Sequence, residues 1–318
     1  MVSNNTFPPI ICLMGPTASG KTRLALELSE RLPHLFGSVI SVDSSMVYRG
    51  MDIGTAKPNL EERAKLPHHL IDIRDPSDSY SAGDFRRDAL KHIENISSVG
   101  QIPLLVGGTM LYFRALQRGI ADLPKADPQI RARLSQEMEN LGIATLHQRL
   151  LDIDATAGAR INVNDAQRIQ RALELYELTG KSPSELFSIN ASEPLPYTII
   201  NIAICPQNRT VLHKRIAERF AKMLHEGFIA EVEELQKRSD LSSDLSALRS
   251  VGYRQAWKYL KGEISYDNMC EEAVVATRQL AKRQLTWLRS WPHVVWFYSD
   301  DRNLSQTVAD YILKEMKN

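Results

Sequence analysis

The stretch Ile10-Ile-Cys-Leu-Met-Gly-Pro-Thr-Ala-Ser-Gly-Lys-Thr22 decides the fold, because an apolar run of strand length ends directly at a phosphate-binding loop. Gly15 and Gly20 enclose four residues and are followed by Lys21 and Thr22, which completes the G-x-x-x-x-G-K-T spacing. Backbone N–H groups of such a loop point at one anion, Lys21 adds positive charge, and Thr22 offers a hydroxyl ligand for Mg²⁺. A helix expected from Lys21 to Arg31 directs its positive end at the same place. The stretch therefore predicts a site for a di- or triphosphate.

The composition is that of an ordinary globular protein. With 318 residues, of which 43% are hydrophobic, the chain can bury a large core and divide into two lobes. The net charge of +1 gives no overall field, so a surface for nucleic acid must be a local patch. Cys12, Cys205 and Cys270 show no C-x-x-C spacing, which fits a reducing compartment and argues against a zinc site. No apolar run is long enough to span a bilayer and no signal peptide is visible, so we expect a cytoplasmic location without a membrane partner.

Further strand patterns predict a parallel sheet. The stretch Ser38–Asp43 is rich in β-branched residues and ends on an acid, and with the first strand and helix it forms a strand–helix–strand unit. Because ligands gather at the carboxyl ends of parallel strands, Asp43 is expected beside the phosphate loop. A short strand is expected over His68–Ile73, and a serine-capped helix over Ser81–Ile93. Adjacent strand residues point to opposite faces, so the two neighbouring histidines favour hydrogen bonding over metal binding.

The strand Ile102-Pro-Leu-Leu-Val-Gly-Gly-Thr109 departs from the pattern of nucleoside triphosphatases. Such hydrolases normally end this strand on an aspartate that organises Mg²⁺ and water. Here Gly107 and Gly108 allow the backbone to approach a ligand, and Thr109 offers a neutral hydroxyl. The site is therefore equipped to hold a diphosphate but lacks an obvious group that activates water.

The middle of the chain reads as an all-helical insertion. Pro124, Asp127 and Pro128 mark a linker, after which amphipathic patterns run to about Pro196. We expect residues 1–120 and 197–318 to form the α/β domain, into which a strand over Thr198–Cys205 returns, and residues 121–196 to form the insertion. On one helical turn of the insertion lie Gln167, Arg168, Gln170 and Arg171, which can meet phosphates and bases; a solvated helix face is the alternative.

Cations gather in two later segments. The helix after Cys205 carries Arg209, His213, Lys214, Arg215 and Arg219 at the strand edge, where one of them can clamp a second phosphate group, although spacing does not say which. A long helix over Met269–Trp287 is expected to place Arg278 and Lys282, and Arg289 just past its end, on one basic face. Such a face is typical of contact with a phosphate backbone, with a calmodulin-like target or plain surface helix as the alternatives.

Taken in order, these motifs closely resemble those of tRNA dimethylallyltransferases. The similarity extends from about Ile10 to Trp291. The segments on which it rests are Gly15–Thr22, Asp43-Ser-Ser-Met-Val-Tyr48, Gly50-Met-Asp-Ile-Gly-Thr-Ala-Lys-Pro58, Gly107-Gly-Thr109 and Lys282-Arg-Gln-Leu-Thr-Trp-Leu-Arg289. The resemblance implies a P-loop α/β fold with a helical insertion. It also implies Mg²⁺-dependent transfer of the dimethylallyl group of dimethylallyl diphosphate to the exocyclic amine of the adenosine 3′-adjacent to the anticodon. The cysteine count fits the bacterial type of chain, which has no zinc finger.

The resemblance also implies roles for single residues. Asp43 is expected to accept the proton that the amine loses, with a role as Mg²⁺ ligand as the alternative, while Thr109 is expected in the reaction channel and Arg215 at the diphosphate. The diphosphate is expected on Gly15, Pro16, Thr17, Ala18, Ser19, Gly20, Lys21 and Thr22, with Thr22 as the metal ligand. The target base must be flipped out of the anticodon loop to react. Residues expected against the tRNA anticodon stem-loop are Asp43, Ser44, Ser45, Met46, Thr109, Arg131, Gln167, Arg168, Ile169, Gln170, Arg171, Arg249, Ser250, Val251, Gly252, Tyr253, Arg254, Lys282, Arg283, Gln284, Leu285, Thr286, Trp287, Leu288 and Arg289.

Two other functions compete with this interpretation. A small-molecule kinase suits the phosphate loop and a lid-like helical insertion, but the missing aspartate and the basic helices argue against it. A non-catalytic RNA-binding module leaves the phosphate loop and its acid unexplained. The loop is also a nucleotide-binding motif, and the sequence leaves open whether ATP occupies it. A monomer is the simpler expectation for a deep channel that two substrates enter from opposite ends.

Overall fold

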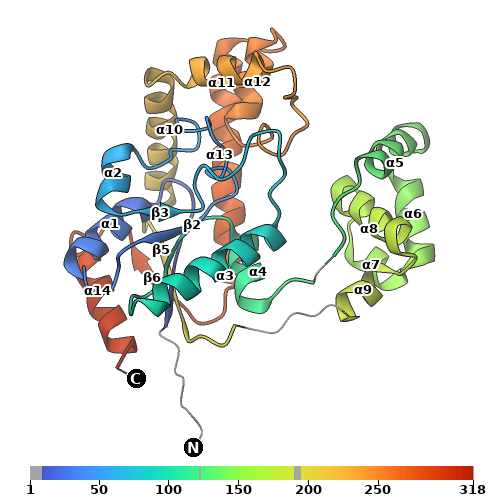
Figure 1. The fold of residues 1–318 in the computed structure, drawn as a ribbon. Coiled ribbons are helices and arrows are strands. Elements are labelled where there is room, and N and C mark those ends of the chain that lie inside the picture. The colour runs from blue at the N-terminus through green and yellow to red at the C-terminus, as the bar shows by residue number, and fades with distance from the viewer. Residues whose placement is uncertain (1–8, 122, 190–194, 318) are drawn as a thin grey trace, which may run out of the picture. The chain divides into compact units, whose positions relative to one another are not determined.

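The computed structural model describes residues 9–121, 123–189 and 195–317, and its sheet is entirely parallel (Figure 1). The strands within these ranges are β1 (Ile10–Met14), β2 (Val39–Val42), β3 (His68–His69), β4 (Leu104–Gly107), β5 (Ile199–Cys205) and β6 (Val294–Tyr298). They lie in the order β3-β2-β4-β1-β5-β6, and each neighbouring pair is parallel. The predicted α/β fold built on a parallel sheet is therefore confirmed.

Helices connect the strands and flank the sheet, as crossover connections in parallel sheets require. In chain order they are α1 (Lys21–Arg31), α2 (Leu60–Lys65), α3 (Ala82–Ser98), α4 (Met110–Arg118), α5 (Pro128–Leu141), α6 (Ile143–Ile153), α7 (Ala155–Arg160), α8 (Ala166–Thr179), α9 (Pro183–Ile189), α10 (Arg209–His225), α11 (Phe228–Gln236), α12 (Tyr253–Leu260), α13 (Tyr266–Arg289) and α14 (Leu304–Glu315). Among the described residues, no helix is both long and apolar enough to cross a membrane.

The chain divides into two compact units. One combines the residues up to Leu116 with those from Pro196 onward and contains the sheet. The other runs from Gln117 to Leu195, and its described elements are the helices α5 to α9. This helical unit has its own hydrophobic core, in which Leu134, Leu150 and Leu173 are fully buried. It therefore buries the apolar faces of α5, α6 and α8 against one another.

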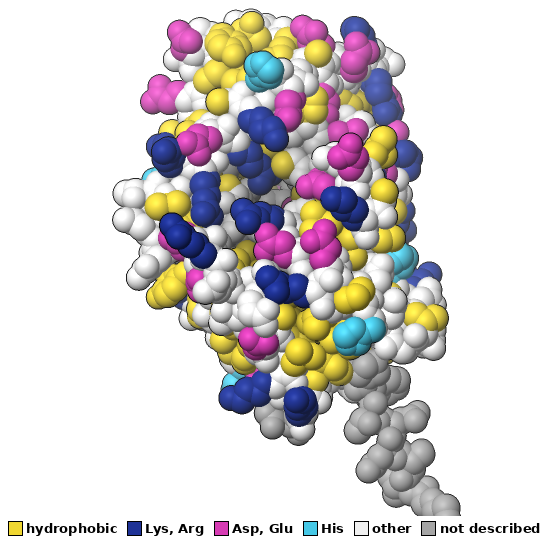
Figure 2. Space-filling model, turned by 90° about the vertical axis from the view of Figure 1, so that its left-hand side faces the viewer, with side chains coloured by type: hydrophobic (Ala, Val, Ile, Leu, Met, Phe, Trp, Pro, Cys, Tyr) yellow, Lys and Arg dark blue, Asp and Glu magenta, His cyan; other side chains and the backbone are white. Residues whose placement is uncertain are grey.

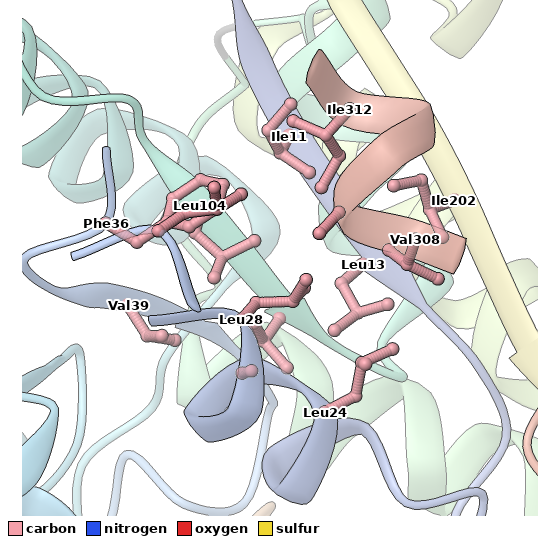
Figure 3. Close-up of a cluster of buried hydrophobic side chains, with 14 of the residues drawn as sticks. Ile11, Leu13, Leu24, Leu28, Phe36, Val39, Leu104, Ile202, Val308 and Ile312 are labelled. Carbon is pink, nitrogen blue, oxygen red and sulfur yellow. The ribbon is translucent and has the colours of Figure 1, made fainter. Parts of the chain in front are cut away.

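Strand β1 lies in the hydrophobic core of the sheet unit. Ile11 and Leu13 of β1 pack with Leu24 of α1, and Figure 3 shows Val308 and Ile312 of α14 in the same cluster. Every residue of β1 is buried, as expected for a strand of a parallel sheet that is covered on both faces. The apolar run that the sequence places before the phosphate loop is thus the buried strand that leads directly into it.

The pairing of the strands brings three loops to one edge of the sheet. Met14 at the end of β1 pairs with Gly107 of β4, and Gly107 pairs in turn with Val42 of β2. The three strands therefore end level with one another. Since the residues that follow them are Gly15, Asp43 and Gly108, these leave the sheet side by side, which confirms the position expected for Asp43.

Several predicted elements differ from the structure at their ends. The helix expected over Ser81–Ile93 continues to Ser98. The strand expected over His68–Ile73 is wrong beyond His69, because Leu70 and Asp72 have positive φ angles of 62° and 57° that a strand cannot contain. The long helix expected to end at Trp287 continues to Arg289, so Arg289 lies on α13 and not past its end. Ser81 caps α3, as the sequence predicts. The cap of α5 is Asp127, which is predicted from the sequence only as part of a linker.

Candidate functional site

The phosphate-binding loop is closed by its own lysine. Lys21 Nζ donates to the carbonyl oxygens of Gly15 at 2.9 Å and Pro16 at 2.8 Å. An added Cβ at Gly15 would lie 2.6 Å from the carbonyl oxygen of Ile204 in β5. Only glycine therefore lets the loop lie this close to β5. Ala18 and Gly20 adopt left-handed conformations with φ of 61° and 91°, and α1 begins directly after them. The loop thus has the curled backbone and helix N-terminus that suit a phosphate.

A glutamine from α13 joins the phosphate loop to the end of β4. Gln284 Oε1 accepts the Thr17 N–H at 2.9 Å, and Gln284 Nε2 donates to the Gly108 carbonyl at 2.9 Å. The sequence assigns Gln284 to RNA contact, but in the structure its side chain binds the loop. An added Cβ at Gly108 would lie only 2.5 Å from Gln284 Nε2, so the glycine is needed for this bridge.

Replacing Gly108 by alanine is expected to weaken binding of inorganic pyrophosphate by about tenfold to thirtyfold. The methyl group displaces the Gln284 amide and so removes two hydrogen bonds, each contributing about 1 kcal/mol. Calorimetric titration measures the affinity. Gly83→Ala is the matched control, because its Cβ would meet Ser81 Oγ at an ordinary 3.7 Å. Equal affinities in the two variants would show that the bridge does not shape the phosphate site.

A cavity of about 1090 Å³ lies in the sheet unit over the ends of these strands. Its lining includes Lys21 and Thr22 of the phosphate loop, Asp43 after β2, Gly108 after β4, and Arg219 of α10. Figure 2 shows Lys and Arg side chains gathered around a hollow on one face of the molecule. The cavity therefore brings cations, a helix N-terminus and a carboxylate into one space, as strand order predicts.

Asp43 is held by the turn that follows it. Its Oδ1 accepts the backbone N–H groups of Ser45 at 2.8 Å and Met46 at 3.2 Å. Both hydrogen bonds are accepted by Oδ1, so Oδ2 has no hydrogen-bond partner among the described residues, and Asp43 lines the cavity. A carboxylate with one oxygen anchored and one available is suited to accept a proton or to bind a cation.

Two arginines of α10 reach the cavity, and they have different partners. Arg219 donates to Thr17 Oγ1 at 3.4 Å and to the Thr55 carbonyl at 3.2 Å, which places it against the phosphate loop. Arg215 lies one turn earlier and donates to Ser299 Oγ at 2.9 Å. Burial lowers the pKa of Arg219, and nearby Asp43 opposes this effect. The sequence names both arginines, and spacing cannot separate them because two residues four apart share one helix face. The choice of Arg215 rests on the resemblance to the family.

The surroundings of Lys21 lower the pKa of its ammonium group. Burial, followed by the charge of Arg219, lowers its pKa to about 8, although Asp43 acts in the opposite direction. A bound diphosphate would favour the charged ammonium, because it adds negative charge beside it. In the absence of a ligand, part of the Lys21 population is therefore neutral at mildly alkaline pH.

The low pKa of Lys21 predicts opposite pH trends for ligand affinity and for stability. Pyrophosphate affinity should fall as pH rises through about 8, because the neutral amine attracts the anion less. The unfolded lysine keeps its proton up to its ordinary pKa of 10.5, so the ligand-free protein gains free energy of unfolding between about pH 8 and 10.5 from this group. Calorimetric titrations and denaturant unfolding across this range measure both quantities. Pyrophosphate affinity that stays constant up to pH 10 would contradict the prediction.

Other predicted residues are close to Asp43. The Thr109 hydroxyl accepts the Ser44 N–H at 3.1 Å, which fastens the start of α4 to the turn after Asp43. Ser45 Oγ and Ser250 Oγ are 2.9 Å apart, so the segment Arg249–Arg254 adjoins the same turn. Thr109 itself is not among the residues that line the cavity, whereas Ser250 is. The structure thus brings three sequence-predicted segments together beside Asp43.

Predicted runs of RNA-contacting residues contain buried members. Tyr253, Ile169 and Leu288 are all fully buried, because a continuous run on a helix covers every face and one face must pack inward. Exposed members are Ser44, Gln167, Arg168, Arg249, Arg254, Lys282, Arg283, Thr286 and Arg289, and the partly buried ones include Gln170, Leu285 and Trp287. The exposed residues are mainly basic. Only these exposed residues of each run are therefore available to contact RNA.

Two of the predicted arginines of the helical unit form ion pairs with the same acid. Glu174, whose side chain is fully buried, accepts from Arg131 at 2.9 Å and from Arg171 at 2.6 Å. Gln170 Nε2 donates to the Arg131 carbonyl at 2.9 Å. Burial works against ionisation of Glu174, but the hydrogen bonds from both arginines outweigh it and lower its pKa. The arginines are therefore oriented by an internal acid that the sequence does not single out.

Comparison with known proteins agrees with this geometry. The family described as IPP transferase matches residues 46–291. A protein from Coxiella burnetii named tRNA dimethylallyltransferase is 55% identical over 308 residues, which cover 97% of this chain and 98% of that protein. The solved structure of the full-length tRNA isopentenylpyrophosphate transferase from Bacillus halodurans has 36% identity and a TM-score of 0.71, covering 98% of this chain and 97% of that one. A eukaryotic dimethylallyltransferase acting on tRNA has 26% identity and a TM-score of 0.76, covering 96% of this chain and 79% of that one.

Proposed function

This chain belongs to the IPP transferase family, that of the tRNA dimethylallyltransferases, and from that membership we propose that it prenylates tRNA. The reaction transfers the dimethylallyl group of dimethylallyl diphosphate to the exocyclic amine of the adenosine 3′-adjacent to the anticodon, and releases diphosphate. The observation that carries the proposal is the placement of Lys21 and Asp43 in one cavity. A phosphate site and a proton acceptor are the two parts that alkylation of an amine by a diphosphate ester needs.

The phosphate loop is suited to stabilise the departing diphosphate. In the reaction the bond between the prenyl carbon and the diphosphate oxygen breaks, so negative charge builds up on that oxygen. Lys21 and Arg219 both reach the loop, and the N-terminus of α1 points to it. Groups fixed in advance around a developing charge lower the barrier more effectively than water, which would have to reorganise. We propose Arg219, together with Lys21, as the cationic clamp on the diphosphate.

Asp43 is suited to accept the proton that the amine releases. As the new carbon–nitrogen bond forms, the adenine nitrogen becomes positively charged and loses one proton. Oδ1 of Asp43 is held by Ser45 and Met46, so Oδ2 is the oxygen that we propose takes this proton. The Thr109 hydroxyl supports the same turn through Ser44, and we propose that it keeps the turn in position for the incoming base.

The residues present also fit a magnesium ion that is bound with the substrate. In the described part of the chain, no three His, Cys, Asp or Glu side chains are grouped to hold a metal ion. The Thr22 hydroxyl and the Asp43 carboxylate do line one cavity with the phosphate loop. Mg²⁺ typically takes one or two protein oxygens together with substrate phosphates. We propose that Thr22 holds it, where it would neutralise diphosphate charge.

The RNA is proposed to contact the exposed cations that surround this site and those of the helical unit. Arg249, Arg254, Lys282 and Arg289 are exposed in the sheet unit, and Arg168 is exposed in the helical unit. Cations that neutralise phosphates supply most of the affinity for RNA and make it depend on salt. We propose that the helical unit binds the anticodon stem-loop, and that the protein acts in the cytoplasm as a monomer.

Incubation with radiolabelled dimethylallyl diphosphate and unmodified tRNA tests the proposal. We expect label to enter the RNA, and to do so only when the prenyl carbon carries it. A kinase would instead transfer phosphate from ATP to a small acceptor and leave the RNA unlabelled. A non-catalytic RNA-binding protein would bind the tRNA without labelling it, and Lys21→Ala would leave that binding unchanged. Transfer of phosphate from ATP without labelling of the RNA, or binding of tRNA without labelling, would refute the transferase.

A further inference from the structure

One carboxylate outside the proposed reaction centre receives an unusual number of hydrogen bonds. Glu231 of α11 accepts three successive backbone N–H groups, those of Asp52 at 2.8 Å, Ile53 at 2.7 Å and Gly54 at 3.1 Å. It also accepts the hydroxyl of Tyr253 at 2.5 Å. The acid is more than 170 positions away from the loop it binds, so local folding cannot account for the contact. Charge-assisted bonds of this kind are about twice as strong as neutral ones.

The same loop is also fixed by close packing. An added Cβ at Gly54 would lie 2.3 Å from the ring of Phe228 and 2.6 Å from that of Tyr253. The two rings meet edge to face with centroids 5.1 Å apart, and both are fully buried. The backbone at Gly54 therefore rests directly on an aromatic pair from α11 and α12. Glu231 binds the N–H groups of this loop, and the two rings pack against its backbone at Gly54.

The loop leads directly to the diphosphate clamp. Thr55 follows Gly54, and its carbonyl accepts Arg219 Nη2 at 3.2 Å. The Thr55 hydroxyl donates to the Met51 carbonyl at 2.7 Å, so this residue is fixed from both sides. The other terminal nitrogen of Arg219 lies 3.4 Å from Thr17 Oγ1 in the phosphate loop. Glu231 is thus connected to the arginine through a single ordered loop.

We propose that Glu231 is a positioning residue for the donor site. By holding the N–H groups of Asp52, Ile53 and Gly54, it places the Thr55 carbonyl so that the Arg219 guanidinium points at the diphosphate. Glu231 is not required to touch either substrate. The inference rests on the proposed function, because it assumes that Arg219 binds the diphosphate. It assigns a role to an acid that no motif in the sequence indicates.

Calorimetric titration with inorganic pyrophosphate, in the absence of RNA, tests this role. Glu231→Gln keeps the shape of the side chain but turns one acceptor oxygen into a donor that confronts the N–H groups. We expect it to weaken pyrophosphate binding about tenfold. Glu233→Gln is the matched control, since Glu233 is exposed on the same helix, and it should bind as the unmodified protein does. Tyr253→Phe removes only one of the four bonds, so it should fold and weaken binding about twofold to threefold.

Repeating both changes in an Arg219→Ala background separates positioning from a general loss of structure. If Glu231 acts through Arg219, neither Glu231→Gln nor Tyr253→Phe weakens binding further once Arg219 is absent. The inference would be overturned if Glu231→Gln still caused a full tenfold loss in the Arg219→Ala background. It would also be overturned if Glu231→Gln and Tyr253→Phe did not change the affinity of the otherwise unmodified protein. Neither result would contradict the donor site itself. Failure of the unmodified protein to bind pyrophosphate at all would instead overturn the proposed function, and this inference with it.

Discussion

Asp43→Asn is expected to lower the rate of dimethylallyl transfer by about 10²-fold to 10⁴-fold, the usual contribution of a positioned general base. Asparagine retains an oxygen that can accept the N–H groups of Ser45 and Met46, so the turn should persist. The amide that replaces Oδ2 cannot accept a proton. Single-turnover transfer at saturating tRNA and dimethylallyl diphosphate measures the rate. Filter binding should show tRNA affinity close to that of the unmodified protein.

Asp301→Asn is the control for this change. Asp301 Oδ1 accepts the Asn303 N–H at 2.9 Å, so it has the same kind of local turn but lies outside the main cavity. Its transfer rate should match that of the unmodified protein. If Asp43→Asn also transfers at a rate within threefold of the unmodified protein, Asp43 is not the base. Loss of the rate only at low Mg²⁺ would assign Asp43 to metal binding instead.

Arg219→Ala is expected to lower kcat/KM for dimethylallyl diphosphate by about 10²-fold to 10³-fold, as loss of one preorganised donor to a developing anion does in other enzymes. The guanidinium lies against the phosphate loop through Thr17 and is fixed by the Thr55 carbonyl. Lysine at this position would keep the charge but lose the planar fork, so Arg219→Lys should recover only part of the activity. Steady-state transfer assays with varied donor concentration measure these values.

Arg215→Ala is the informative comparison, because Arg215 lines the same cavity one helical turn away. Its guanidinium is bound to Ser299 Oγ, so we expect a loss of less than tenfold. The reverse order of effects would assign the diphosphate to Arg215, which is the assignment that resemblance to the family suggests. Equal, large losses in both variants would indicate that both arginines bind the diphosphate.

The sheet edge that carries the site could be predicted from sequence because its signals are local. An apolar run, a glycine-rich loop and a helix follow one another between Ile10 and Arg31, and the next buried strand ends at Val42, directly before Asp43. Parallel strands place their carboxyl ends together, so the proximity of Asp43 to the phosphate loop needs no long-range information. The same locality explains why Ser81 could be predicted as the cap of α3.

The partners of the phosphate loop could not be predicted, because they come from distant parts of the chain. Gln284 binds Thr17 across 267 positions, and Arg219 reaches the same residue across 202. Their helices carry several polar residues, and only the packed structure shows which face turns inward. Leu288 illustrates the same limit: it belongs to a motif expected against RNA, yet its side chain is buried. The buried Glu174 and the partly buried Glu231 give no pattern in the sequence.

Mass analysis of the adenosine 3′-adjacent to the anticodon, after incubation of unmodified tRNA with dimethylallyl diphosphate and Mg²⁺, tests the central claim most directly. The account predicts that this nucleoside gains one dimethylallyl group on its exocyclic amine with the unmodified protein, and almost none with Asp43→Asn in the same time. An unmodified adenosine after prolonged incubation with folded protein that binds both substrates would contradict it.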